Sequence, residues 1–103
     1  MIIQVNTNSS IEGSARLEDY VKETLQSKLE RFSNEITRIE VHLSDQNGDK
    51  PGQDDNQCKV EARLKGMNPI TVIEKAGDID SAITGASNKM RTVLTTQLDK
   101  LKN

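Results

Sequence analysis

Residues 38–43, RIEVHL, alternate polar and apolar side chains, and residues 58–65, CKVEARLK, repeat this alternation. A period of two is typical of a β-strand that buries one face and exposes the other to solvent. The segment from Asp45 to Asn56 between them contains Pro51 and is rich in Gly, Asp and Asn, which predicts a long hairpin loop. The two stretches therefore predict two strands joined as a hairpin.

Two further strands are expected on either side of this hairpin in the sequence. The short apolar run IIQV at residues 2–5 predicts a first strand, and the polar cluster at residues 6–10 ends it. The turn GMNP at residues 66–69 leads into a fourth strand from Ile70 to about Glu74. Ile70 and Val72 are expected to face inward there.

Two segments follow the period of an amphipathic helix. The first begins at the N-cap Ser14 and runs to about Phe32; the second begins at the N-cap Asp78, with Asp80 in its first turn to suit the helix dipole. Gly85 inside the second helix costs ~1 kcal/mol relative to Ala, so close packing against a neighbour is expected. The apolar stripes are Leu17, Val21, Leu25, Leu29 and Phe32 in the first helix, and Ile79, Ala82, Ile83, Ala86, Met90, Val93, Leu94, Leu98 and Leu101 in the second.

The order of elements is therefore β-α-β-β-β-α, an α+β fold. Each helix has one apolar stripe and three strands have one apolar face. The arrangement that buries these surfaces is a four-stranded sheet with two helices packed on one face, and the other face open to solvent. With 103 residues and no break in composition, residues 1–103 are expected to form a single domain.

The composition excludes several classes of protein. A net charge of -2 at pH 7 argues against a protein that coats nucleic acid through bulk positive charge. Tyr20 and Phe32 are the only aromatic residues, which excludes modules that stack bases on exposed aromatic rings. One cysteine cannot form an internal disulfide, and no run of about 20 apolar residues could span a membrane. A cytoplasmic protein with no membrane partner is expected.

The residues that could act in catalysis or bind a metal do not form a recognisable site in the sequence. His42 lies on the polar side of its strand with no second histidine, and Cys58 lies on the apolar side of its strand, as core cysteines do. The acidic residues of the 45–56 loop do not follow the spacing of a calcium-binding loop. We therefore expect no enzyme: no catalytic residue, no metal, no cofactor and no small-molecule substrate.

What remains is a set of basic side chains on one strand face and near the end of the second helix. Residues 88–103 hold four basic side chains and one acidic one. A mixed-charge solvated face explains these side chains as well as contacts to the phosphates of a structured RNA do. Composition and spacing alone therefore indicate a small α+β binding domain.

Several short segments, taken in order, resemble the ribosome hibernation promoting factor family, which includes the ribosome-associated inhibitor and the sigma-54 modulation proteins. The resemblance covers nearly the whole chain, and because the chain stops after the second helix it is expected to be a short form without the C-terminal domain of long forms. The matching segments are SARLEDYV at 14–21, KLERF at 28–32, IEVHL at 39–43, DIDSAI at 78–83, NKM at 88–90 and DKLK at 99–102.

The resemblance implies a translation inhibitor that acts in starved or stationary cells. It implies binding to the small ribosomal subunit (16S rRNA) and to the 70S ribosome, where the domain blocks the channel for mRNA and tRNA and basic side chains contact rRNA phosphates. We expect the free protein to be monomeric. Motif matches predict RNA-binding roles for Lys28, Arg31, Lys89, Lys100 and Lys102; the strand pattern adds Arg38, Lys59, Arg63 and Lys65, and the local charge adds Arg91.

Two alternatives remain open from the sequence. The first is a non-ribosomal binder of structured, double-stranded RNA, although such domains depend on a lysine-rich start of the last helix, where this chain has Asp78 and Asp80. The second is a protein-interaction or adaptor module of the same fold that has lost rRNA binding; Thr92 and Thr96, where the family usually has basic residues, favour it. Binding through phosphates should fall steeply with added salt, whereas an apolar protein contact should change little.

Overall fold

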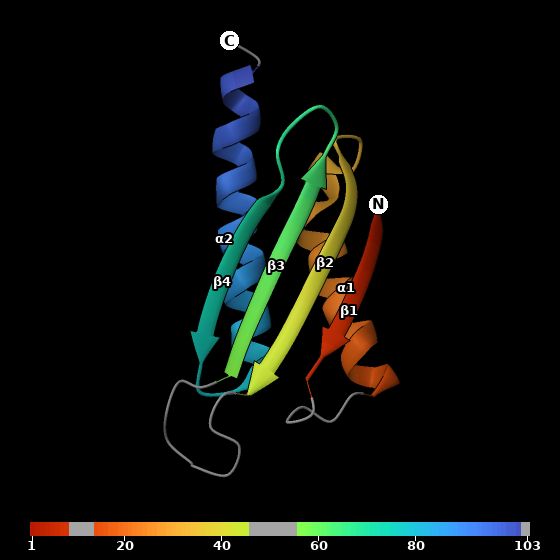
Figure 1. Ribbon diagram of the computed structural model, residues 1–103, viewed down its shortest axis with the longest axis vertical. Helices are drawn as coiled ribbons and strands as arrows, with labels where there is room; N and C mark the ends of the chain where they lie inside the picture. The colour runs from red at the N-terminus through yellow and green to blue at the C-terminus, as the bar shows by residue number, and fades with distance from the viewer. Residues whose placement is uncertain (9–13, 46–55, 102–103) are drawn as a thin grey trace.

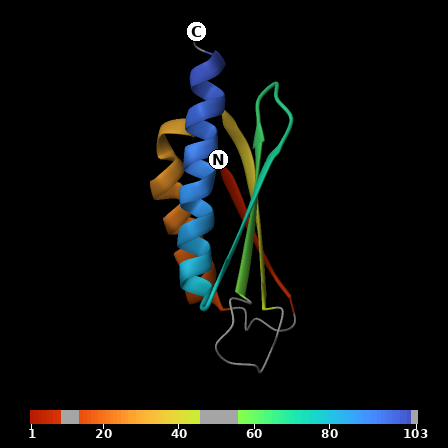
Figure 2. The same cartoon turned by 90° about the vertical axis from the view of Figure 1, so that its left-hand side faces the viewer.

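The structure, a computed structural model, describes residues 1–8, 14–45 and 56–101 and shows two layers (Figures 1 and 2). A four-stranded sheet forms one layer, and both α-helices pack on the same face of it, which confirms the predicted α+β fold. In chain order the elements are β1 (Ile2–Thr7), α1 (Ala15–Leu29), a 3-10 turn (Glu30–Phe32), β2 (Ile36–Asp45), β3 (Asn56–Leu64), β4 (Ile70–Ala76) and α2 (Ile79–Leu101). No helix in this part of the chain combines the length and the apolar composition needed to cross a membrane.

The sheet is mixed and its strands follow the order β1-β2-β3-β4. β1 runs parallel to β2, while β3 is antiparallel to both β2 and β4. Parallel neighbours need a crossover connection, and α1 lies on that crossover. The strands β2 and β3 extend further toward the 45–56 loop than the alternating pattern alone predicts.

A β-bulge at Thr37 interrupts the regular register at the start of β2. Ile36 pairs with Leu64 but Arg38 pairs with Arg63, so Thr37 is an extra residue opposite the β3 strand. The Thr37 hydroxyl donates a hydrogen bond to the Arg63 carbonyl at 3.1 Å. The bulge lets Ile36 and Ile39, three residues apart, both point into the core.

Both predicted helix caps are present. The Leu17 N–H donates to the Ser14 hydroxyl at 3.0 Å, and the Ser81 N–H donates to a carboxylate oxygen of Asp78 at 2.7 Å. The first helix was expected to continue to Phe32, but α1 ends at Leu29 and its last turn tightens into the 3-10 turn. Tightening of a last turn is common at helix ends, and here the turn buries Phe32.

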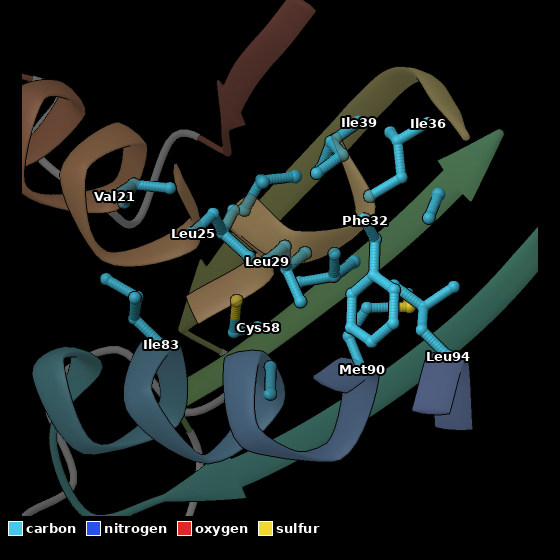
Figure 3. Close-up of a cluster of buried hydrophobic side chains, with 14 of the residues drawn as sticks. Val21, Leu25, Leu29, Phe32, Ile36, Ile39, Cys58, Ile83, Met90 and Leu94 are labelled. Atoms are coloured by element: carbon cyan, nitrogen blue, oxygen red, sulfur yellow. The ribbon is translucent and has the colours of Figure 1, made fainter. Parts of the chain in front are cut away.

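One hydrophobic core fills the space between the two layers (Figure 3). It combines most of the predicted α1 and α2 stripes with the inward faces of the strands, whereas Val93 is half-buried outside the core and the side chain of Leu101 lies outside the described residues. The labelled members come from α1 and its 3-10 turn (Val21, Leu25, Leu29, Phe32), from α2 (Ile83, Met90, Leu94) and from the sheet (Ile36, Ile39, Cys58). Burial of each large aliphatic side chain contributes about 1.5–3 kcal/mol, so this core sets the position of both helices on the sheet.

Candidate nucleic-acid interface

A basic hollow lies on the helix side of the molecule, beside the C-terminal end of α1. It has a volume of about 620 Å³. Lys28 comes from the last turn of α1, Arg31 from the 3-10 turn and Arg91 from the middle of α2. The basic hollow is lined by Ser27, Lys28, Glu30, Arg31, Arg91 and Thr95. Three cations and one carboxylate thus meet here, and the local charge is positive although the chain as a whole is acidic.

The three cations of the basic hollow are free to receive a ligand. Within the described ranges, none of Lys28, Arg31 and Arg91 has a carboxylate within ion-pair distance. The Arg31 guanidinium lies over the Phe32 ring, with its Cζ 4.7 Å from the ring centroid. Stacking on a buried ring restricts the guanidinium while its N–H donors stay available, and a planar fork of donors suits phosphate oxygens.

Charge changes sign along the helix layer. α1 and α2 run in the same direction over the sheet, so their N-terminal ends lie together (Figures 1 and 2). At those ends Asp19, Glu23 and Asp80 line a second hollow with Arg16 and Tyr20. Asp80 in the first turn of α2 and Lys28 in the last turn of α1 also suit the dipoles of their helices. Within the helix layer, a polyanion would therefore be attracted to the basic hollow and repelled by the acidic hollow at the helix N-termini.

Lys89, one of the motif-matched residues, is engaged elsewhere. Its Nζ lies 2.8 Å from Oε1 of Glu74 and donates a hydrogen bond to the Ile73 carbonyl at 2.9 Å. Both partners belong to β4, so Lys89 ties α2 to the edge of the sheet and its charge is balanced. Lys100 is exposed in the last turn of α2, and Lys102 lies outside the described residues.

The basic residues predicted on the strands face the other way. Arg38, Lys59 and Arg63 alternate with buried residues and lie on the open face, so the sheet separates them from the basic hollow. Arg38 pairs with Glu40 at 3.1 Å, and Arg63 pairs with Glu61 at 3.4 Å. The open face therefore balances most of its own charge.

Arg38, Lys59 and Lys65 differ in the further contacts that they make. Arg38 donates to the side chain of Gln4 in addition to its ion pair, whereas Lys59, beside His42 across the strands, has no ion pair within the described ranges. Lys65 follows the end of β3, and its N–H donates to the Glu35 carbonyl at 2.9 Å. Among the nine predicted residues that the structure describes, only Lys28, Arg31 and Arg91 are brought together.

Sequence reasoning missed two polar members of the basic hollow, Ser27 and Thr95. Ser27 precedes Arg31 by four residues, and this spacing places both on one side of the helical segment. That spacing was the signal that could have found it. The Thr95 hydroxyl is already committed, because it donates to the Arg91 carbonyl at 2.8 Å.

Groups with catalytic potential lie away from the basic hollow. Cys58 is fully buried, and this burial raises the pKa of its thiol from 9.0 to about 12, so the reactive thiolate is disfavoured. His42 is exposed on the open face. Among the residues with described positions, no three His, Cys, Asp or Glu side chains gather in a way that could hold a metal ion.

Comparison with known proteins gives a family and a fold. The family described as Sigma 54 modulation protein / S30EA ribosomal protein matches residues 3–102. The fold is similar to the N-terminal domain of Protein Y from Thermus thermophilus, with a TM-score of 0.73 and 24% identity over 91% of this chain and 96% of that one. It is also similar to a ribosomal subunit interface protein from Coxiella burnetii, with a TM-score of 0.78 and 16% identity over 96% of this chain and 99% of that one. No match was found among curated proteins.

Proposed function

This chain belongs to the Sigma 54 modulation protein / S30EA ribosomal protein family, and on that basis we propose that it binds the small ribosomal subunit through phosphates of 16S rRNA and blocks the channel for mRNA and tRNA. The family consists of ribosome-associated factors that are not enzymes. The proposed role is inhibition of translation in starved or stationary cells. It places the protein in the cytoplasm, on 30S subunits and 70S ribosomes, with residues 1–103 acting as one domain.

The basic hollow is the observation that supports this proposal. Lys28, Arg31 and Arg91 come from different turns of the helix layer and converge without carboxylate partners in the described chain. Charge-assisted hydrogen bonds to phosphate are among the stronger ones, and arginine can make two in parallel. Structured RNA offers phosphates at fixed spacing, so two helices held by one core can recognise its shape without stacking bases.

Steric occlusion fits the shape of the domain. Its principal extents are 48 × 24 × 20 Å, and a single core makes it one rigid body. In the proposed position, this rigid body would exclude mRNA and tRNA from the channel. The acidic ends of the helices would be repelled by rRNA phosphates, so the protein should bind in one orientation, with the basic hollow toward the RNA.

Co-sedimentation with purified 30S and 70S ribosomes through sucrose gradients, at low and high salt, tests this function. We expect the wild type to bind at low salt and to dissociate as salt rises, because phosphate contacts release counterions. A variant with Lys28→Glu, Arg31→Glu and Arg91→Glu should lose binding while its circular dichroism stays unchanged. A control with two charge reversals on the open face, Lys59→Glu with Lys75→Glu, should bind like the wild type.

Three outcomes would contradict the proposal. Unchanged ribosome binding by the folded triple variant would show that the basic hollow is not the contact. Absence of binding by the wild type at low salt would favour a protein partner, as the adaptor alternative predicts. Binding that persists at high salt would point to a contact that does not depend on phosphates.

A further inference from the structure

The outer edge of β1 presents unpaired backbone groups. The Asn8 N–H donates to the Leu43 carbonyl at 3.1 Å, so even-numbered residues of this strand turn their backbone groups toward β2. Backbone direction alternates along a strand, and the N–H and C=O groups of Ile3, Val5 and Thr7 therefore point away from the sheet. Within the described ranges, no backbone hydrogen bond reaches this edge.

The two edges of the sheet are protected very differently. At the β4 edge Lys89 donates to the Ile73 carbonyl, and the strand itself carries Glu74 and Lys75. Charges and a covering side chain are the devices by which proteins block edge-to-edge pairing. β1, with the sequence IIQVNT, has no charge, no proline and no bulge. Among the large apolar side chains that the structure describes, Ile2 is also the most exposed, at 61%.

We propose that β1 pairs with β1 of a second copy of this chain, antiparallel and about a two-fold axis at Val5. In this register Val5 faces Val5 of the second copy, and Ile3 faces Thr7 of the second copy. These are the residues whose backbone groups point outward, so each facing pair exchanges two hydrogen bonds. The two four-stranded sheets become one sheet of eight strands.

Side-chain fit favours a second copy as the occupant. Between β1 and α1 lies a hollow of about 310 Å³, lined by Val5, Thr7, Ser14, Ala15, Leu17 and Glu18. Ile3 packs on the helix side of the sheet, so Ile3 of the second copy, opposite Thr7, would enter this hollow. Because β1 carries no charge, two copies can approach without like charges facing each other.

The proposed dimer has a defined relation to the basic hollow. A two-fold axis perpendicular to a continuous sheet keeps the helix layers of both copies on the same side. Both basic hollows therefore face one way, and the dimer presents two phosphate-binding surfaces together. This inference does not depend on ribosome binding, and it replaces the expectation of a monomer with that of a weak, concentration-dependent dimer.

Sedimentation equilibrium on the purified chain tests the proposal. Because interfaces of one strand pair are small, we expect dissociation to be visible between about 10 µM and 1 mM. Val5→Pro removes one outward N–H, which an edge strand tolerates, and should leave a monomer at every concentration. Val5→Thr keeps this N–H and the branched shape, and should dimerise within about threefold of the wild type.

Cross-linking tests the register independently of protein stability. Val5→Cys places the thiols of the two copies on facing residues, about 5.5 Å apart between Cα atoms. It should form a disulfide dimer at least about tenfold faster than Gln4→Cys, because position 4 of one copy lies opposite Asn6 of the other and not opposite a second cysteine. Cys58 is buried and should not interfere. A wild type that stays monomeric up to about 1 mM, or equal cross-linking rates for the two cysteine variants, would overturn the proposal.

Discussion

The side chain of Glu74 in β4 packs against Gly85 of α2, and its carboxylate occupies the space that a side chain at position 85 would fill. A Cβ added at Gly85 would lie 2.6 Å from Cγ of Glu74 and closer still to one of its carboxylate oxygens. The same carboxylate reaches Lys89, one turn further along α2, at 2.8 Å. This relation explains why a helix tolerates glycine in its interior: close packing against a neighbour was expected at Gly85, and Glu74 is that neighbour.

Replacement of Gly85 by alanine should destabilise the protein even though alanine favours helix. The new methyl group displaces Glu74 and its contact with Lys89, at a cost of roughly 1–3 kcal/mol that exceeds the ~1 kcal/mol gain in helix propensity. In a Glu74→Ala background the obstacle is gone, so Gly85→Ala should stabilise by up to about 1 kcal/mol. Urea unfolding of the wild type, the two single variants and the double variant measures both effects. If Gly85→Ala changes the free energy of unfolding with the same sign in both backgrounds, the packing explanation is wrong.

Arg91 and Lys89 should affect ribosome binding differently although they are neighbours. Arg91→Met should weaken binding and reduce the slope of log K against log salt by about 1, because one phosphate contact is lost. Lys89→Met should leave that slope unchanged and lower stability by less than about 1 kcal/mol, since its ion pair is half-exposed. Salt titrations of binding and urea unfolding separate the two roles. A larger change of slope for Lys89→Met would reverse the assignment.

Asp78 should contribute to stability as the cap of α2. Asp78→Ala removes the acceptor for the Ser81 N–H and hydroxyl and should cost about 1 kcal/mol. Asp78→Asn keeps an acceptor oxygen and should recover most of this loss. Urea midpoints at pH 7 compare the three proteins, and equal losses for Ala and Asn would show that charge, not capping, accounts for the contribution of Asp78.

Cys58 should make the protein less stable at high pH. Burial raises its pKa from 9.0 to about 12 in the folded state, so the unfolded chain loses the proton first as pH rises. The free energy of unfolding should be independent of this group below pH 9 and should fall by about 1.4 kcal/mol per pH unit between 9 and 12. Other groups titrate in this range, so the measured quantity is the difference from Cys58→Ala. Parallel pH profiles for the two proteins would contradict the prediction.

Local patterns predicted the elements well because each depends on neighbours in the sequence. The alternation around Val41 and Val60, and the caps Ser14 and Asp78, all match the structure. The bulge at Thr37 was not predictable, because Ile36 and Ile39 have helical spacing and only pairing with β3 reveals the extra residue.

The candidate site was predicted less completely, because charge balance depends on tertiary contacts. Lys89 finds Glu74 only when α2 packs on β4, and Arg38 finds Glu40 on the same face of β2. Motif matches give Lys89 and Lys28 the same role, although the structure pairs Lys89 with Glu74 and gives Lys28 no ion pair among the described residues. Local charge alone indicates Arg91, yet the structure makes it the basic residue of α2 that lines the basic hollow with Lys28 and Arg31.

The parallel pairing of β1 also has a consequence during synthesis of the chain. β1 is translated first, but its partner β2 is translated only after α1, whereas β3 and β4 pair with strands already made. Closing a long connection is slower than closing a hairpin, so the nascent chain carries an apolar, uncharged strand before its neighbour exists. β1 therefore depends on later residues for its place in the sheet, and chaperones that bind nascent apolar segments would meet β1 before the other strands of this sheet.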